Sequence, residues 1–401
     1  METAGRDVGP RAAARVLWSR NFGPYFLGNA TSASGTWFQN LAASLLVFRL
    51  THSVFLLGVL NFSQFIPVLV LSPWAGTVAD RVDRRKLLLV TQLVAAGLAG
   101  ALALLAWGGV NEWVVIGFSF ATGVTSAFSA PASQALVVQL VDLDDVPQAV
   151  ALNSMTYNLA RALGPASAAG AIVWLGIPAA FLLNAFSYLL LAGALLVIRP
   201  REQERDESPS LRESIALLRR DPQLVLFLLI VMSVGFASDP INTEAPAFAH
   251  AFGHADTLAG AIIGVFGAGA VTAALVVAGR VAGSRTRMAI TLALLGFGVT
   301  GFALSPWLPL AFLPLFIAGF GYLASNTAAT TRLQLGVPES QRGRIMALWS
   351  IAFLGLRPLA SLTDGALADV FGVRTAGVVL AAPVVLGAAA IVLVSRARVA
   401  A

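Results

Sequence analysis

The sequence predicts an all-α membrane protein whose helices, about twelve in number, cross the bilayer as two similar bundles of six. Hydrophobic residues make up 57% of the 401 residues and charged residues 11%, against a usual charged share of about 25%. Long apolar runs, divided by short charged or turn-rich segments, fill nearly the whole chain, and their pattern recurs in the second half. A water-soluble fold cannot bury that much apolar surface, so lipid must solvate it.

The spans follow from helix length, because about 20 mainly apolar residues are needed to cross the hydrocarbon core. Segments of this length occur six times in each half of the chain. The predicted spans are residues 22–48, 54–74, 86–107, 113–138, 148–175, 178–197, 224–248, 258–281, 288–304, 309–333, 344–370 and 375–394.

The domain organisation follows from these spans and from one extended polar stretch. The expected parts are an N-terminal cytoplasmic tail (1–21), a first bundle (22–198), a linker (199–222), a second bundle (223–395) and a C-terminal tail (396–401). In residues 210–220 of the linker, Leu211, Ile215 and Leu218 share one helical face, which predicts an amphipathic helix at the membrane surface. The charged run before it is interpreted as a solvated connection.

The basic residues predict the orientation, because they resist translocation when they lie near helix ends. With the N-terminus inside, nearly all of them fall on the cytoplasmic side, and only Arg49 and Arg374 fall outside. We therefore expect a multi-pass protein of a bacterial inner membrane with both termini in the cytoplasm. The net charge of +6 then reflects topology and indicates no nucleic-acid partner.

Composition also limits the chemistry. The absence of cysteine excludes disulfides and thiol catalysis, and the three histidines do not suggest a metal site. We expect no cofactor and a monomer in contact with lipid. No nucleophile and base occur at a spacing typical of a membrane enzyme that acts on lipids.

An internal repeat relates the two halves. Residues 151–155 match residues 347–351, and at the same offset residues 159–161 lie over residues 355–357. The fifth and eleventh spans are therefore equivalent. Two halves of the same direction predict a parallel repeat about an axis along the membrane normal, a layout typical of rocking transporters.

The loop after the second span carries the most specific motif, Gly-x-x-x-Asp-Arg-x-x-Arg-Arg, formed by Gly76, Asp80, Arg81, Arg84 and Arg85. Glycine permits a tight turn and close helix approach, and the aspartate can accept hydrogen bonds from a helix N-terminus or an arginine. Such a charge cluster could act as a conformational latch that holds one state and releases another. The alternative is that the basic residues only anchor the topology.

This loop resembles the signature loop of the major facilitator superfamily, and the likeness extends over nearly the whole chain. Softer marks of the branch that contains siderophore exporters and actinobacterial efflux proteins occur at residues 35–39, 50–53, 158–165 and 341–344. The resemblance implies alternating access and export driven by the proton gradient. Two departures bear on proton coupling: the fourth span has no arginine, and the fifth has Ala168 and Ala169 where two glycines are usual. The equivalent loop in the second half, residues 278–285, also has no aspartate.

Two arginines lie near the expected membrane midplane. Arg161 is about 20 Å from the inner end of its helix, and Arg357 is about as deep. Burial of a charge there costs about 2.5–3.5 kcal/mol on insertion scales, which makes each a candidate functional group. Either arginine could bind an anionic group or pair with Asp239 or Asp364 across the domain interface, or be satisfied structurally, and for Arg161 both interpretations stay open. For Arg357, followed by Pro358, the structural interpretation is preferred.

Asp239 is the predicted proton-coupling residue, with Arg161 as the arginine that could restore its charge. It lies about 25 Å along the seventh span, and Pro240 cannot donate a backbone hydrogen bond, which invites a break in the helix there. Alternating exposure would change its protonation. Glu244 is the competing candidate, interpreted as solvated near the aqueous edge. The alternative for Asp239 is a cap on a helix break without titration.

Polar side chains on the first, fifth and tenth spans are candidates to line a central cavity, since the resemblance implies that the first and tenth spans face it. They are Gln39, Asn40, Asn158, Tyr322 and Asn326. The alternative is that such groups serve as hydrogen bonds between helices.

The predicted function is a secondary active transporter that exports a small amphipathic or hydrophobic molecule, such as a drug or siderophore, with the proton as coupling ion. An importer, or a membrane receptor that kept this fold, remains the alternative. The repeat and the signature loop favour transport, because both serve a machine of two moving domains.

Overall fold

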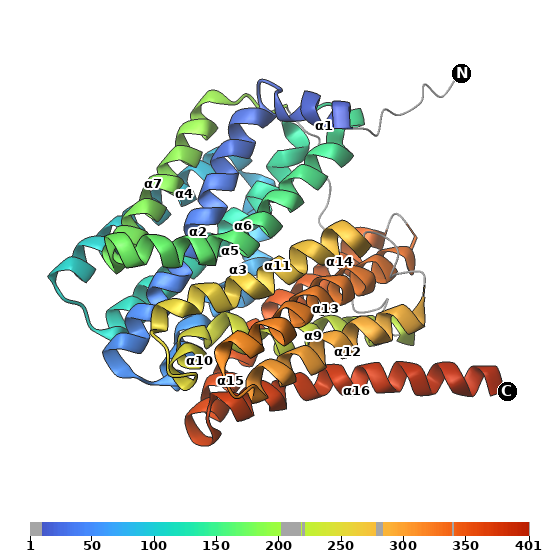
Figure 1. Cartoon of the computed structure of the whole chain (residues 1–401). Helices are drawn as coiled ribbons and strands as arrows, with labels where there is room; N and C mark the ends of the chain where they lie inside the picture. The colour runs from blue at the N-terminus through green and yellow to red at the C-terminus, as the bar shows by residue number, and fades with distance from the viewer. Residues whose placement is uncertain (1–9, 202–217, 219–220, 278–283, 339–340, 401) are drawn as a thin grey trace, which may run out of the picture.

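The computed structural model describes residues 10–201, 218, 221–277, 284–338 and 341–400, and it places them in two helical bundles (Figure 1). The first bundle follows α1 (Pro10–Leu17) and contains α2 (Phe22–Thr51), α3 (Val54–Arg81), α4 (Arg84–Gly108), α5 (Glu112–Gln139), α6 (Val146–Leu175) and α7 (Ile177–Val197). The second contains α9 (Pro222–Thr243), α10 (Ala245–Ala251), α11 (Ala259–Val277), α12 (Arg285–Leu304), α13 (Leu308–Leu335), α14 (Arg342–Ser350), α15 (Arg357–Phe371) and α16 (Val373–Ala400).

Each of the twelve predicted spans is mainly helical over the residues that the structure describes. Among the described residues, ten segments are long and apolar enough to cross a membrane. The two remaining predicted spans form α2 and α6, each of 30 residues, and each packs within the first bundle. The fold class predicted from the sequence is therefore confirmed.

Polar residues at the helix starts fix the short connections. Ser53 accepts a hydrogen bond from the Leu56 amide, Asp83 from Lys86, and Asn111 from Val114, so each side chain satisfies an amide that has no partner within its helix. His52, between α2 and α3, adopts the left-handed conformation at φ 50°, which completes the tight turn before Ser53.

The equivalence of the fifth and eleventh spans is visible in how α6 and α15 end. Gly176 and Gly372 occupy matching positions of the repeat, and both have a positive φ, of 83° and 86°. Glycine adopts this conformation without the steric cost that a β-carbon imposes. Each therefore lets the next helix begin at once.

Several boundaries differ from the predictions. The seventh span does not break at Pro240; the helix ends at Thr243, and α10 begins after Glu244 with Pro246 in its first turn. A π-helical turn, Ile351–Gly355, separates α14 from α15 in the eleventh span. Helix α16 continues to Ala400, where a tail was expected.

The N-terminal segment and the linker can also be compared with the predicted domain organisation. Residues 10–17 of the expected N-terminal tail form α1, whose Val16 is buried against the first bundle. The amphipathic helix predicted for residues 210–220 lies outside the described residues, apart from Leu218.

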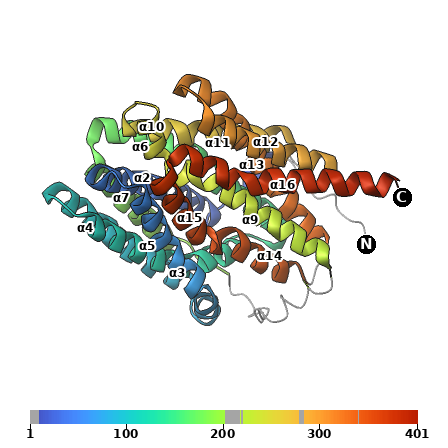
Figure 2. The same cartoon turned by 90° about the horizontal axis from the view of Figure 1, so that it is seen from below.

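The two bundles meet at one end. We call the end that holds α1 and the start of α9 the terminal end, and the opposite end, with His52 and α10, the distal end. In Figure 1 the bundles come together at their distal ends and diverge toward their terminal ends. The principal contacts between them are made by α3 with α15 and by α6 with α11 (Figure 2).

Candidate functional site

Small residues bring the bundles into close contact at the distal end. A β-carbon on Gly58 of α3 would overlap the Ser361 carbonyl of α15, and one on Gly365 would come within 3.1 Å of Gly58. On the other side, a β-carbon on Gly260 of α11 would overlap Ala169 of α6. Close approach of this kind is how helices associate within lipid. The contact is therefore a specific seam between the bundles.

Polar groups at the distal surface complete this seam. Arg49 at the end of α2 forms an ion pair with Asp256, which lies in the short 3₁₀ helix Asp256–Leu258 before α11. The rings of His52 and His250, from opposite bundles, lie 6.4 Å apart between centroids, and Phe48 contacts both. The first bundle is thus held against the second by charge as well as by packing.

A pocket lies between the bundles, on the terminal side of this seam. Its lining includes Trp37 and Asn40 from α2, Asn61 and Phe65 from α3, Asn242 from α9 and Arg357 from α15. Aromatic surfaces and amide groups together suit a molecule with both apolar and polar parts.

Arg357 contacts both bundles at the edge of this pocket. Its guanidinium carbon lies 4.5 Å from the centroid of the Phe65 ring in α3, which is a cation–π contact. Its Nε lies 3.6 Å from Oδ1 of Asp239 in α9. The Arg357 side chain is 19% exposed and that of Asp239 only 1%. Arg357 therefore bridges the two bundles at the edge of the pocket.

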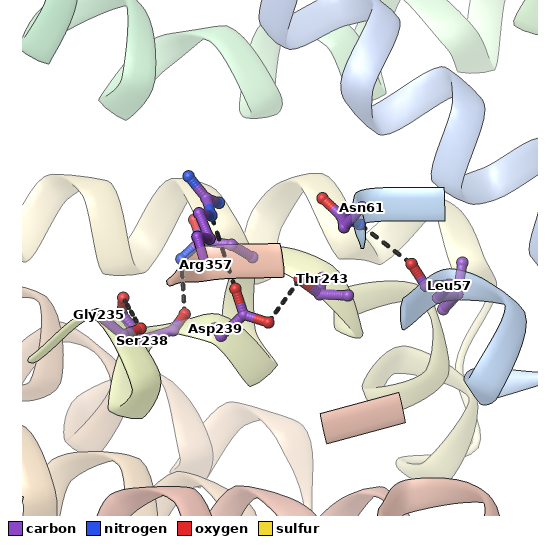
Figure 3. Close-up of polar contacts among 8 residues, drawn as sticks. Leu57, Asn61, Gly235, Ser238, Asp239, Thr243 and Arg357 are labelled. Atoms are coloured by element: carbon purple, nitrogen blue, oxygen red, sulfur yellow. Dashed lines mark hydrogen bonds and ion pairs between the residues drawn. The ribbon is translucent and has the colours of Figure 1, made fainter. Parts of the chain in front are cut away.

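The Asp239 carboxylate is held in place on its second oxygen as well. Thr243 donates a hydrogen bond of 3.0 Å to Oδ2, one helical turn further along α9 (Figure 3). In the same view Arg357 lies above Asp239, and Asn61 of the other bundle faces the same space. Asp239 therefore has Arg357 as its ion-pair partner at the edge of the pocket.

The alternative partner predicted for Asp239 was Arg161. The side chains of Arg161 and Asn158 lie outside the described part of the structure.

Glu244 is fully buried, at 0% exposure, so its interpretation as a solvated group near the aqueous edge is wrong. Glu244 lies at the junction of α9 and α10, where the surrounding residues cover it completely. Asp364 of α15 is also at 0% exposure. The second bundle thus buries the carboxyl groups of Asp239, Glu244 and Asp364.

The predicted cavity residues divide into two groups. Asn40 lines the pocket and accepts a hydrogen bond of 2.9 Å from Gln64. Gln39 instead bridges helices within the first bundle: it donates to Thr122 at 3.3 Å and accepts from Asn184 at 2.7 Å. For Gln39 the alternative role, as a hydrogen bond between helices, is the one observed.

The tenth-span candidates do not line this pocket. Tyr322 is buried within the second bundle, where its ring packs against Phe266 and Phe353. Asn326 is half-buried on the same helix. The pocket residues that the sequence analysis did not select include Trp37, Asn61, Phe65 and Asn242. Their depth in their helices was visible from the sequence, but the direction of their side chains was not.

The signature loop lies at the terminal end, where the bundles are apart. Gly76 is an interior residue of α3, and a β-carbon there would meet nothing within 4 Å, so the expected tight turn and close approach do not occur in this conformation. Arg85 donates hydrogen bonds to the carbonyls of Leu195 and Leu196 at the end of α7, where a cation also complements the helix dipole.

The other predicted latch residues are less informative in this conformation. Arg81 is exposed, and the side chain of Asp80 lies outside the described part of the structure. The role of the loop as a latch therefore stays a prediction.

Two repeated helical bundles that close around a polar pocket at one end and diverge at the other are an arrangement typical of membrane transporters. The chain belongs to the major facilitator superfamily, because the family model "Transmembrane secretion effector" matches residues 15–401. It is therefore a transporter and not an enzyme.

Curated relatives place the chain in the branch predicted from the sequence. The staphyloferrin A transporter of Staphylococcus aureus is 26% identical, over 84% of this chain and 87% of its own. Macrolide efflux protein A of Streptococcus pyogenes is 23% identical, over 57% of this chain and 58% of its own.

Solved structures share the fold. A bacterial homologue of the human lysosomal transporter Spinster, in an inward-facing and occupied conformation, matches with a TM-score of 0.76 at 14% identity over 94% of this chain and 96% of its own. The nucleoside transporter NupG matches with a TM-score of 0.72 at 13% identity over 94% and 99%.

Proposed function

We propose that this protein exports a small amphipathic or hydrophobic molecule from a bacterial cell and that inward proton movement through Asp239 drives the export. The observation that carries the proposal is the position of the Asp239–Arg357 pair. A carboxylate buried at membrane depth beside an arginine is costly to maintain, so it is a functional group by default. This pair also lies at the edge of the pocket that both bundles form.

The predicted orientation supports export. In this orientation the terminal end is the entrance for substrate from the cytoplasm. The positive-inside pattern of the sequence predicts that both termini lie in the cytoplasm. The present conformation, closed at the distal end, is then inward-facing, as is the matching structure of the bacterial Spinster homologue. The name of the macrolide efflux relative describes the same direction of transport.

The coupling step follows from the Asp239–Arg357 distance. In the closed distal state Arg357 neutralises the Asp239 carboxylate at 3.6 Å. When the bundles rock, Phe65 of the first bundle moves away from Arg357, which changes the solvent and the partners of both groups. Protonation of Asp239 would release Arg357 toward the pocket, where it can contact a polar group of the substrate. Proton binding by Asp239 and substrate binding would thereby be coupled, because both change the partner of Arg357.

The direct test is Asp239→Asn in inverted membrane vesicles, with a panel of drugs and siderophores as substrates. We expect gradient-driven accumulation to be lost, while exchange of substrate between preloaded vesicles persists, because asparagine keeps the shape but cannot carry the proton. Asp369→Asn is the matched control, since Asp369 is an exposed carboxylate on α15. Unchanged, pH-dependent accumulation in the Asp239→Asn protein would exclude Asp239 as the coupling residue.

The same vesicles distinguish export from import. An exporter fills inverted vesicles when their interior is acidic, whereas an importer fills right-side-out vesicles when their exterior is acidic. Accumulation only in the second case would replace the proposed export with import.

A further inference from the structure

Three carboxyl groups are buried together in the second bundle, beside the distal seam. Asp239 lies on α9, Glu244 at the junction of α9 and α10, and Asp364 on α15. Their relative exposures are 1%, 0% and 0%. Helices α9, α10, α15 and α16 pack around them, so all three lie in one protein interior.

The three carboxyl groups differ in their partners. Asp239 has Arg357 and Thr243, as described above. Both oxygens of Glu244 and both oxygens of Asp364 are buried without a hydrogen-bond partner in the described structure. Such groups are rare in proteins, and each calls for an explanation.

Among the side chains that the structure describes, no charged group supplies a counter-ion for Glu244 and Asp364. Arg357 is paired with Asp239, and Arg374 at the start of α16 donates to the backbone carbonyls of Ala303 and Ser305. Toward the distal surface the next groups are His250 on α10, His52 beyond it, and the Arg49–Asp256 ion pair. Helix α11 carries no charged residue, and the described charged residue of α3, Arg81, lies at its terminal end.

Charge balance therefore decides the state of the cluster. Within the described structure one arginine faces three carboxyl groups and cannot neutralise all of them, and a buried carboxylate without a partner takes up a proton in preference to staying charged. We propose that Glu244 and Asp364 each bind a proton while the distal end is closed, and that they form a proton-binding pair separate from Asp239. The ligand is the proton itself, taken from water as each carboxylate becomes a carboxylic acid.

The position of Asp364 connects this pair to the distal seam. Its neighbours on α15, Ser361 and Gly365, are the residues that contact Gly58 of α3. When α3 separates from α15 to open the distal end, the cover over Asp364 is removed and water can reach the carboxyl group. The two protons would then exchange with the distal side only, and their release would favour the open state because two adjacent carboxylates repel each other.

The use of these protons in transport rests on the proposed function, but their presence does not. The test is the infrared absorption of protonated carboxyl groups in the full chain, reconstituted in lipid in sodium-free buffer at neutral pH. We expect Glu244→Gln and Asp364→Asn each to remove the absorption of one carboxylic acid, and the double variant to remove that of two. Asp369→Asn, on the same helix as Asp364, is expected to change nothing.

Two results would overturn the proposal. If the double variant retained the full absorption, neither group would be protonated. If sodium added to the wild-type protein abolished the absorption at neutral pH, the pair would be a sodium site. Either single variant is informative, so failure of one to fold does not prevent the test. If the Glu244 and Asp364 variants lose the infrared absorption as expected but the Asp239→Asn protein transports normally, the proposed coupling step is overturned and the proton-binding pair stands.

Discussion

Arg49 and Asp256 join the two bundles at the distal end through two hydrogen bonds, Nε to Oδ2 at 2.5 Å and Nη2 to Oδ1 at 2.9 Å. The geometry is that of a two-point arginine–carboxylate pair, which fixes orientation as well as distance. Because the two residues come from opposite bundles, the pair exists only while the distal end is closed. It therefore stabilises one conformation of the transport cycle and not the fold of either bundle.

Loss of this pair should shift the protein toward the distal-open state. Half-exposed ion pairs contribute about 0.2–1 kcal/mol, so Asp256→Asn should raise the distal-open population by a factor of about 1.5 to 5. The measurement is labelling of a cysteine introduced at Ser44, which lines the pocket, by a reagent that cannot cross the membrane. The exchanged pair Arg49→Asp with Asp256→Arg should restore the slow labelling; fast labelling in that double variant would argue against the ion pair as the cause.

The glycine contact in the seam gives a stronger effect. Gly58→Leu places a side chain where the backbone of α15 lies, so the distal end cannot close. We expect transport to be lost and labelling at the introduced Ser44→Cys site to increase, with normal expression. Gly97→Leu is the control, because a β-carbon at Gly97 meets nothing within 4 Å. Full transport by the Gly58→Leu protein would show that the seam is not part of the cycle.

Gln39 and Asn40 are neighbours in the sequence with different expected roles. Gln39→Ala removes contacts to Thr122 and Asn184, and such bonds within membranes contribute about 0.6 kcal/mol, with about 1.7 kcal/mol as the largest values. It should therefore lower the thermal unfolding midpoint in detergent. Asn40→Ala should instead change the apparent affinity for substrate, with a smaller effect on unfolding. A larger loss of stability in the second variant than in the first would reverse this assignment.

The signature loop can be tested by one charge change. Asp80→Asn removes the acidic group of the proposed latch but keeps the basic residues that fix the topology, so transport should fall while expression and insertion remain normal. Arg81→Gln provides the comparison, because it removes a basic group and leaves the aspartate. Full activity of Asp80→Asn in the vesicle assay would reduce the loop to a topological anchor.

The orientation can be measured directly because the chain contains no cysteine. A single cysteine at Ser208 should react with an impermeant reagent only in inverted vesicles, and one at Thr51 only in intact cells. The expectation rests on the distribution of basic residues. The opposite pattern would invert the topology and, with it, the direction of proposed export.

The sequence was sufficient for the fold because a membrane span has a length requirement that no other context alters. Where the structure describes them, all twelve segments are mainly helical, and the repeat in residues 151–161 and 347–357 identified equivalent helices. It was less informative about breaks within a span. Pro240 lies in the interior of α9, because a proline removes only one backbone hydrogen bond from the helix. The helix ends instead just before Glu244, and Pro246 lies in the first turn of α10.

The site was harder to predict because depth in the membrane says nothing about which neighbour covers a side chain. Glu244 was counted along the helix as near the surface, yet α10 and the surrounding helices bury it completely. Gln39 and Asn40 lie at the same depth and point to different surroundings. The pairing of Asp239 with Arg357 required the packing of α9 against α15, which no local pattern records.

The π-helical turn Ile351–Gly355 has a consequence for the symmetry of the molecule. A π turn holds one residue more than an α turn, so side chains before it are rotated by about one residue, or roughly 100°, relative to a continuous α-helix. Helix α6 runs from Val146 to Leu175 without such a turn. Residues that align between the two copies after this turn, such as Gly176 and Gly372, keep equivalent directions. Those aligned before it, such as Leu348, which packs in a different hydrophobic cluster from Leu152, are expected to be rotated relative to their counterparts, so the two halves can diverge at matched positions without any insertion in the chain.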